Sequence, residues 1–326
     1  MLGDGVRRDV ATISEEERCL LLAALLKLDD DASQFVYPDN HGHDGADEHG
    51  NITYWDMQEQ IHQDGHVHGV DVHRGPGFIP WHRVLTNHFE ALLREVDSRL
   101  SLHYWDWTTD PRVATADRAA LFTPAFMGSA SGNAGPPLQD FESTEITGDP
   151  HLGLPGDGVH DHIWRAVGAE QAKPSGEPDI DPDDFIVNAA DFTAFAARLT
   201  NAHNRVAHTY IGGSIKNPHF SFHDPFVYLL HSNVDRLWAT WQRAPGHPER
   251  LDPAHAYGTI LADLQQPPTY YDELVQPWAG VDLAGAVITD LNPWKDDIAG
   301  AREPVPYTDL KVITPVSYDT ALAPSS

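Results

Sequence analysis

The chain has 326 residues, and its 21 Lys and Arg against 49 Asp and Glu give a formal net charge of −28. This balance argues against a nucleic-acid partner, because few cations are present to displace the counterions of a phosphate backbone. It argues equally against an anionic membrane surface, which recruits clusters of Lys and Arg. The unusual feature is an excess of histidine, 20 residues beside a single cysteine. Histidine is the commonest metal ligand, so this excess indicates metal chemistry.

The N-terminal region contains Arg7-Arg8, a pair that also marks twin-arginine export signals. Ser14-Glu15-Glu16-Glu17 follows, where such a signal needs an apolar segment. Ser14 and Glu17 instead form a capping-box pattern, which predicts a helix over Glu15–Leu28. No apolar run reaches the eighteen or so residues of a membrane span. We therefore expect a soluble chain without a signal peptide of its own, either cytoplasmic or exported with a partner.

Helical periodicity recurs in four further segments. These are Thr53–His62, Thr86–Leu100, Ala190–Tyr210 and Pro225–Gln242. A long passage rich in Gly and Pro, Thr108–Asn188, separates the second segment from the third. The sequence therefore predicts a mainly α protein, a four-helix bundle wrapped by long loops with minor β structure.

The last part of the chain is Pro-rich and irregular, with a short helix expected at Tyr257–Leu264 and a strand at Leu310–Pro315. We expect one domain over residues 1–326. Its core covers residues 6–242, and the loop-rich segment 243–326 packs on that core.

Two clusters of histidines each place one histidine late in a helix and another on or before the next helix. The first contains His62, His66, His68, His73 and His82, and the second contains His203, His208, His223 and His231. Helix bundles build metal sites in this way, from ligands that project inward from facing helices. Imidazole ligands favour copper, zinc or iron over magnesium and calcium, which prefer oxygen.

The choice among these metals follows from the residues around the clusters. A bridged di-iron bundle needs a Glu-x-x-His step in both halves. Glu59 and His62 supply one such step, but no Glu occurs between Glu177 and Glu249, so the second half lacks it. A zinc hydrolase with three histidines needs one cluster and not two. Two all-histidine clusters are best explained by a pair of copper ions.

These motifs resemble the tyrosinase, catechol oxidase and hemocyanin family of type-3 copper proteins, and most of all a bacterial or archaeal tyrosinase-type phenol oxidase. The resemblance covers the chain from about Val6 to Gln242. It rests on four stretches: His73-Arg74-Gly75-Pro76-Gly77-Phe78-Ile79-Pro80-Trp81-His82-Arg83, His103-Tyr104-Trp105-Asp106-Trp107, His203-Asn204 with Ile211-Gly212-Gly213, and Asp224-Pro225 through His231 to Asp235 and Trp238.

The resemblance implies two copper ions (Cu²⁺) and a set of ligands for each. His62, His73 and His82 are implied to bind one ion, and His203, His208 and His231 to bind the other. His66 and His68 are alternatives to His62, because they lie in the short segment that follows it.

Four further residues are expected to support this site. The resemblance implies that Asn204 positions a water molecule as a proton acceptor in catalysis. Phe89 is expected to contribute to an apolar surround that excludes water. Asp235 lies four residues after His231 and is expected to orient an imidazole or to pair with an arginine. His223 is expected to support the site or the fold beside it.

Three departures from the family pattern are visible in the sequence. His203 and His208 are five residues apart where the family has four, and a step of five turns the second ligand about 140° from the first. We therefore expect a π-bulge between them. A Glu that many tyrosinases carry upstream of His203 is absent, and Asp191 is the nearest upstream acid. Cys19 is too far from the first cluster for a thioether crosslink, and we expect it to be a small buried residue.

The function implied by the resemblance is oxidation of o-diphenols to o-quinones with O2, and ortho-hydroxylation of monophenols remains open. O2, a small phenolic substrate and a copper-delivery protein are the expected partners. The missing Glu favours one alternative, a catechol or o-aminophenol oxidase without hydroxylase activity. A hemocyanin-like O2 carrier and a proenzyme plugged by its C-terminal segment are the others.

Overall fold

A computed structural model of the protein describes residues 2–38, 51–67, 78–141, 162–170, 182–217, 220–251 and 317–318. Within these ranges the chain is mainly helical, with three short two-stranded sheets. The expected mainly α class with minor β structure is confirmed. None of the helices in these ranges is both long enough and apolar enough to cross a membrane.

Seven α-helices and three helices of other types follow one another along the described chain. The α-helices are α1 (Glu15–Leu28), α2 (Tyr54–Val67), α3 (Phe78–Val96), α4 (Asp183–Val187), α5 (Phe192–Ala202), α6 (Gly213–Lys216) and α7 (Phe226–Gln242). The others are the π-helix η1 (His203–Thr209) and the 3₁₀ helices η2 (Ser221–His223) and η3 (Pro248–Leu251).

The strands pair over few residues. β1 (Val6–Arg7) pairs in parallel with β6 (Ser317–Tyr318), so the two ends of the described chain meet. β2 (Val36–Pro38) pairs antiparallel with β3 (Asn51–Thr53), and β4 (Ser131–Asn133) with β5 (Trp164–Ala166).

Helix α1 has the bounds that the capping pattern predicts. The Ser14 side chain accepts a hydrogen bond from the Glu17 backbone N–H at 3.2 Å, which satisfies one of the unpaired donors at the helix start. Leu21 and Leu25 are buried against the core. Cys19 is exposed, so the expectation that it is buried was wrong. It lies two residues before Leu21, about 200° around the helix and therefore on the opposite face.

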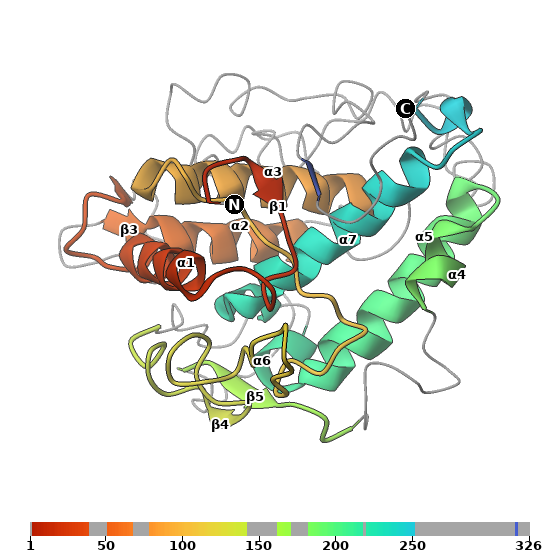
Figure 1. Ribbon diagram of the computed structural model, residues 1–326. Coiled ribbons are helices and arrows are strands. Elements are labelled where there is room, and N and C mark those ends of the chain that lie inside the picture. Colours follow the sequence, from red (N-terminus) through yellow and green to blue (C-terminus); the bar gives the residue numbers. More distant parts are fainter. Residues whose placement is uncertain are drawn as a thin grey trace.

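Helices α2, α3 and α7 lie next to one another and enclose the centre of the molecule (Figure 1). Ring contacts join α2 to the other two: Trp55 packs edge-on against Phe89 of α3 and Tyr228 of α7, with centroid distances of 5.8 and 5.7 Å. Helix α5 crosses on the far side of α7, where Phe195 stacks on Trp241 at 5.2 Å. The residues at these contacts are buried, so the helices share one apolar core.

Several predicted boundaries were wrong. The helix expected at Thr86–Leu100 begins at Phe78 and ends at Val96. Pro80 lies in the first turn of this helix, where a missing N–H costs no helical hydrogen bond. The helix expected at Thr53–His62 continues to Val67. The long passage expected to be irregular contains β4, β5 and α4.

The remaining expectations for the C-terminal part fall largely outside the described residues. The helix expected at Tyr257–Leu264 and the strand expected at Leu310–Pro315 both lie there. Ser317 and Tyr318 are described, and their pairing with β1 brings this part of the chain to the N-terminal strand.

Candidate metal centre

The second histidine cluster is built on an uncommon helix. Helix α5 changes at His203 into the seven-residue π-helix η1, which ends at Thr209. The π-helix has a wider turn than an α-helix, so a residue five positions on returns to the same face. The Nε2 atoms of His203 and His208 lie 2.9 Å apart. The expected π-bulge between these two residues is confirmed.

The orientation of His208 is fixed by the chain that follows it. Its Nδ1 donates a hydrogen bond to the carbonyl of Ile215 in α6, which leaves the lone pair on Nε2 facing His203. Helix α6 starts at Gly213, which has φ of +57° and lies so close to β5 that a Cβ would stand 2.0 Å from the carbonyl oxygen of Trp164. Glycine is required here, because both the conformation and the space exclude a side chain.

The third member of this cluster, His231, comes from the first turns of α7. One ring nitrogen from each of His203, His208 and His231 can be chosen so that all three lie within 4.8 Å of one another. All three residues are buried. Three neutral imidazoles that converge in this way form a site suited to copper, zinc or iron.

The first cluster contributes His62 from α2 and His82 from α3, with ring centroids 5.9 Å apart. The Nδ1 of His82 donates to the carbonyl of Phe78 at 2.8 Å, so its Nε2 carries the lone pair. His82 also stacks on His231 at 4.1 Å between centroids and 8° between planes. The two clusters therefore meet face to face at the contact between α3 and α7.

The first cluster has three other histidines, His66, His68 and His73. His68 and His73 lie outside the described residues, and so does the side chain of His66. The choice of ligands for the first ion therefore stays a prediction.

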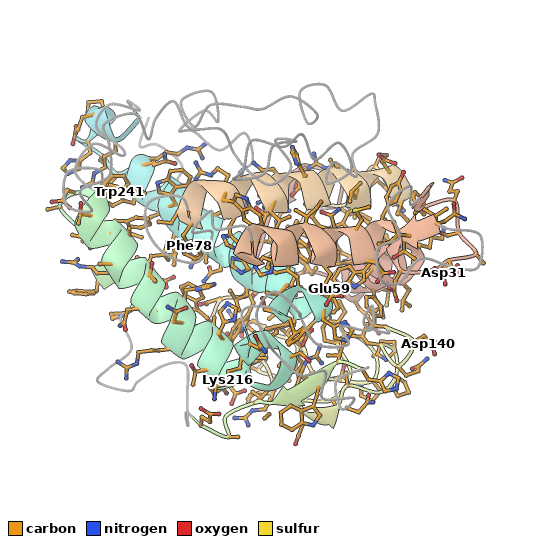
Figure 2. All side chains as sticks on the ribbon, turned by 180° about the vertical axis from the view of Figure 1, so that it is seen from behind. Asp31, Glu59, Phe78, Asp140, Lys216 and Trp241 are labelled. Atoms are coloured by element: carbon orange, nitrogen blue, oxygen red, sulfur yellow. The ribbon has the colours of Figure 1, made fainter. Side chains whose placement is uncertain are left out.

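Aromatic rings close around both clusters. The ring centroid of Phe222 lies 4.0 Å from the ring centroid of His62 and 5.2 Å from that of His231. The ring centroid of Phe78 lies 4.8 Å from the ring centroid of His82 and 4.9 Å from that of His203. Figure 2 shows Phe78 at the start of α3. These rings exclude water from the space between the histidines.

Burial keeps the imidazoles of His82, His208 and His231 neutral. It lowers the pKa of His82 to about 3 and that of His208 to about 4, and it lowers the pKa of His231 well below its usual value. The neighbouring histidines His82, His203, His208 and His62 lower the pKa of His231 further. Metal ions bind the neutral form of imidazole, so these groups do not have to lose a proton first at neutral pH.

A buried ion-pair network fastens the helices that carry the histidines. Asp235, one turn after His231, accepts a hydrogen bond from the Nε of Arg83, which directly follows His82. Arg83 also lies over the Trp238 ring, 3.6 Å from its centroid. Asp235 was expected either to orient an imidazole or to pair with an arginine, and the structure has the arginine pair.

The N-terminal strand joins the same network. Arg7 of β1 is buried, and its Nε donates to Glu90 of α3 at 2.6 Å while its Nη1 lies 3.5 Å from Asp235. Removing one partner from such a buried network is costly, since it leaves an uncompensated charge.

The contacts of the other residues expected near the site show which of them are buried in the core and which face solvent. Phe89 stacks on Tyr228 at 3.6 Å, one helical turn before His231. The Nδ1 of His223 lies 3.6 Å from Glu59 Oε2, and both side chains are buried. Asn204 is exposed, and its backbone carbonyl accepts a hydrogen bond from Thr209 Oγ1. Asp191 is the N-cap of α5, where it accepts a hydrogen bond from the Ala194 backbone.

Neither Phe222 nor Glu59 was predicted from the sequence to take part in a copper site. The position of Glu59 near the site could have been predicted, because it lies three residues before His62 and therefore on the same helix face. Phe222 lies in a 3₁₀ turn between helices, where no periodic pattern marks the buried face.

Comparisons with known proteins agree with this geometry. Residues 42–244 match the family described as the common central domain of tyrosinase. The chain is 31% identical over 218 residues to a tyrosinase of Streptomyces lincolnensis, which covers 63% of this chain and 74% of that protein. It is 28% identical over 255 residues to hemocyanin 2 of Megathura crenulata, which covers 72% of this chain and 6% of that protein.

Two solved structures share the fold. A polyphenol oxidase from Thermothelomyces thermophila superposes with a TM-score of 0.56 at 17% identity, over 96% of this chain and 87% of that one. Deoxygenated hemocyanin from Rapana thomasiana gives a TM-score of 0.56 at 22% identity, over 96% and 69% of the two chains. The protein therefore belongs to the tyrosinase family of type-3 copper proteins, as a copper oxidoreductase of the tyrosinase and polyphenol oxidase type.

Proposed function

We propose that this protein holds two copper ions and uses O2 to oxidise o-diphenols to o-quinones. His203, His208 and His231 hold one ion, and His62, His73 and His82 hold the other. The observation that carries the proposal is the buried meeting of five histidines from α2, α3, η1 and α7, linked by the 2.9 Å Nε2 contact and the 4.1 Å stack.

The protein's own residues prepare the site for this reaction. Copper, when bound, supplies one-electron redox chemistry with O2 and Lewis acidity toward a phenolic oxygen. The carbonyls of Phe78 and Ile215 hold the ring tautomers of His82 and His208, so that each Nε2 is ready to bind metal. Phe222 and Phe78 keep bulk water out and give a phenol ring apolar surfaces to contact.

A reaction limited to diphenols is favoured by the surroundings of His203. Helix α5 carries no acid, and Asp191 at its start is twelve residues away, about 18 Å along the helix axis. Asp191 is also engaged as the helix cap. In this proposal Asn204 positions a water molecule but has no carboxylate beside it on α5, so ortho-hydroxylation of monophenols is slow or absent.

Copper content tests the ligand assignment. We expect about two copper ions per chain in the loaded protein and about one after His208→Ala or His82→Ala, because each substitution removes one of three imidazoles. His247→Ala is the matched control, since His247 is exposed and paired with Glu249 at 2.8 Å. Mass spectrometry of metal content measures this. Unchanged copper in both ligand variants would contradict the assignment.

Oxygen consumption tests the activity, with a catechol and the matching monophenol assayed in parallel. We expect turnover of the catechol and little or none of the monophenol. Equal turnover of both would make the protein a full tyrosinase. Reversible O2 binding without turnover of either would replace the proposal with an O2 carrier or a plugged proenzyme.

A further inference from the structure

A second group of buried polar side chains lies beside the histidines, and the ligand assignment leaves it without a role. Trp55, Gln58 and Glu59 of α2, His223 of η2 and Tyr228 of α7 belong to it. Glu59 precedes His62 by three residues, and Tyr228 precedes His231 by three. The group therefore lies about one helical turn, roughly 5 Å, from the histidine layer. Figure 2 shows Glu59 on α2, near the start of α7.

Phe222 connects this group with the metal centre. It directly precedes His223, its ring lies 4.0 Å from that of His62, and it packs edge-on against Tyr228 at 4.9 Å. The backbone that places Phe222 against the histidines therefore also places the His223 imidazole next to Glu59.

Several polar atoms of this group need a partner. Among the described residues, no hydrogen bond reaches either ring nitrogen of His223, the Gln58 amide, the Trp55 indole N–H or the Tyr228 hydroxyl. Buried polar groups are almost always hydrogen-bonded, and bound water serves those that protein atoms do not reach. The 3.6 Å between His223 Nδ1 and Glu59 Oε2 is too long for a direct hydrogen bond and suits a bridging water.

The charges around His223 favour a bound proton. Burial alone lowers its pKa, but the carboxylates of Glu59, Asp224 and Asp56 outweigh burial and raise it. Asp224 is itself paired with the buried Arg165 at 2.7 Å, whereas Glu59 Oε2 faces the His223 ring at 3.6 Å from Nδ1. Burial, with a smaller effect of Glu59, raises the pKa of Tyr228, which stays a neutral hydroxyl.

We propose that Glu59 and His223, joined through bound water, form an internal proton-accepting pair for the metal centre. The inference rests on the proposed oxidase function. Two o-diphenols release four protons and four electrons, and one O2 takes up the same protons and electrons to become two waters. A proton leaves the substrate hydroxyl, passes along bound water to the Glu59 carboxylate, and later returns to the oxygen that is reduced.

The first experiment measures the catechol reaction of Glu59→Gln, which keeps the size of the side chain and removes the charge. General acid–base groups contribute about 10²- to 10⁴-fold, so we expect kcat to fall by roughly 100-fold with KM and copper content unchanged. The pH profile of kcat is expected to lose the limb that reports the pair. Glu59→Asp recovers part of kcat, and His223→Asn shows the same loss as Glu59→Gln.

Glu17→Gln is the matched control. Glu17 of α1 and His103 form a second buried pair at 3.2 Å, and no histidine of the two clusters contacts it in the described chain. This variant is expected to keep kcat and its pH profile, because it removes a buried Glu–His pair without touching the metal centre. A loss equal to that of Glu59→Gln would overturn the proposal, since it would mark a general effect of buried pairs.

A second readout does not depend on activity. Nitrogen-15 NMR of the histidine rings, in the cuprous protein, reports the protonation of His223, with His223→Asn as the assignment control. We expect the ring to keep its proton to a higher pH in the wild type than in Glu59→Gln, because the Glu59 carboxylate raises the pKa of His223. A ring that loses its proton at the same pH in both proteins, or an active Glu59→Gln enzyme with an unchanged pH profile, overturns this inference alone. A wild-type enzyme that oxidises no diphenol overturns it together with the proposed function.

Discussion

Two histidines of the centre, His82 and His208, are oriented by backbone carbonyls. His82 donates its Nδ1 hydrogen to Phe78, one turn earlier on the same helix, and His208 donates its own to Ile215, across the Gly212-Gly213 turn. A carbonyl fixes the tautomer without adding charge to the pocket. Two nearby carboxylates, Asp235 and Glu90, pair with arginines.

Asp56 gives a prediction for the pH dependence of stability. Its burial, followed by the nearby charge of Glu59, raises its pKa to about 7 from 3.8. The folded protein therefore binds a proton at this site that the unfolded chain has lost above pH 4. The free energy of unfolding falls by about 1.4 kcal/mol per pH unit between roughly pH 4 and 7 from this group. Asp56→Asn removes that dependence and still accepts the hydrogen bond from Thr53 Oγ1.

We therefore expect Asp56→Asn to gain stability over the wild type as the pH rises from 5 to 7, by up to a few kcal/mol. Urea unfolding at each pH measures the difference. Asp97→Asn is the control, because hydrogen bonds from Arg99 lower the pKa of Asp97 to about 2 and both states are ionised throughout this range. Parallel curves for wild type and Asp56→Asn would contradict the raised pKa.

At the scale of single elements, the π-helix η1 accommodates one additional residue between His203 and His208 at the end of α5. His203 and His208 are five apart, and the wider turn returns both to the same face, with Nε2 atoms 2.9 Å from each other. Deleting the exposed Arg205 restores a spacing of four, which an ordinary α-helix presents on one face. We expect this variant to keep about two copper ions per chain and to unfold at a higher temperature.

Copper content and the midpoint of thermal unfolding measure both expectations. Loss of one copper ion with an intact fold would mean that the wide turn itself sets the ligand geometry. Retained copper with a lower midpoint would mean that η1 is not strained. Either result would contradict the view that the π-helix only accommodates an inserted residue.

How much of the structure could be predicted from the sequence differs from element to element. Helix α1 was predicted with its bounds, because a capping box is a local signal, and α7 within one residue, because Pro225 ends the preceding segment. Helix α3 begins at Phe78, eight residues before the predicted start. Pro80 lies in its first turn, and a proline normally indicates a helix boundary in a sequence. The π-helix followed from ligand spacing alone.

At the candidate site, too, some features could be predicted from the sequence and others could not. Five histidines were placed by motif and spacing, and the structure brings them together. The pairing of His223 with Glu59 depends on how η2 packs against α2, and the covering of the site by Phe222 depends on an irregular turn. Such contacts arise from tertiary packing, for which one sequence has no periodic signal.

At the scale of the whole molecule, the ends of the described chain support the centre. β1 carries Arg7 into the ion-pair network of Glu90 and Asp235, and β6 pairs with β1. The strand pair thus ties a segment near the C-terminus to the helices that hold the histidines. The same molecule carries a net charge of −28 with only five lysines, so its surface groups repel one another strongly at low salt.

That repulsion predicts a stability that rises with salt. The Debye length falls from about 10 Å at 0.1 M to about 3 Å at 1 M, so screening weakens repulsion between exposed carboxylates. We expect the midpoint of thermal unfolding to rise over this range, to the same extent in sodium chloride and potassium chloride. The rise should be smaller at pH 5.5 than at pH 8, because protonation of exposed members of the 20 histidines offsets part of the negative charge. A midpoint that is flat or falls with salt at pH 8 would mean that the acidic surface is already neutralised by local pairs such as Arg99–Asp97 and Arg112–Asp110, and that net charge does not govern stability here.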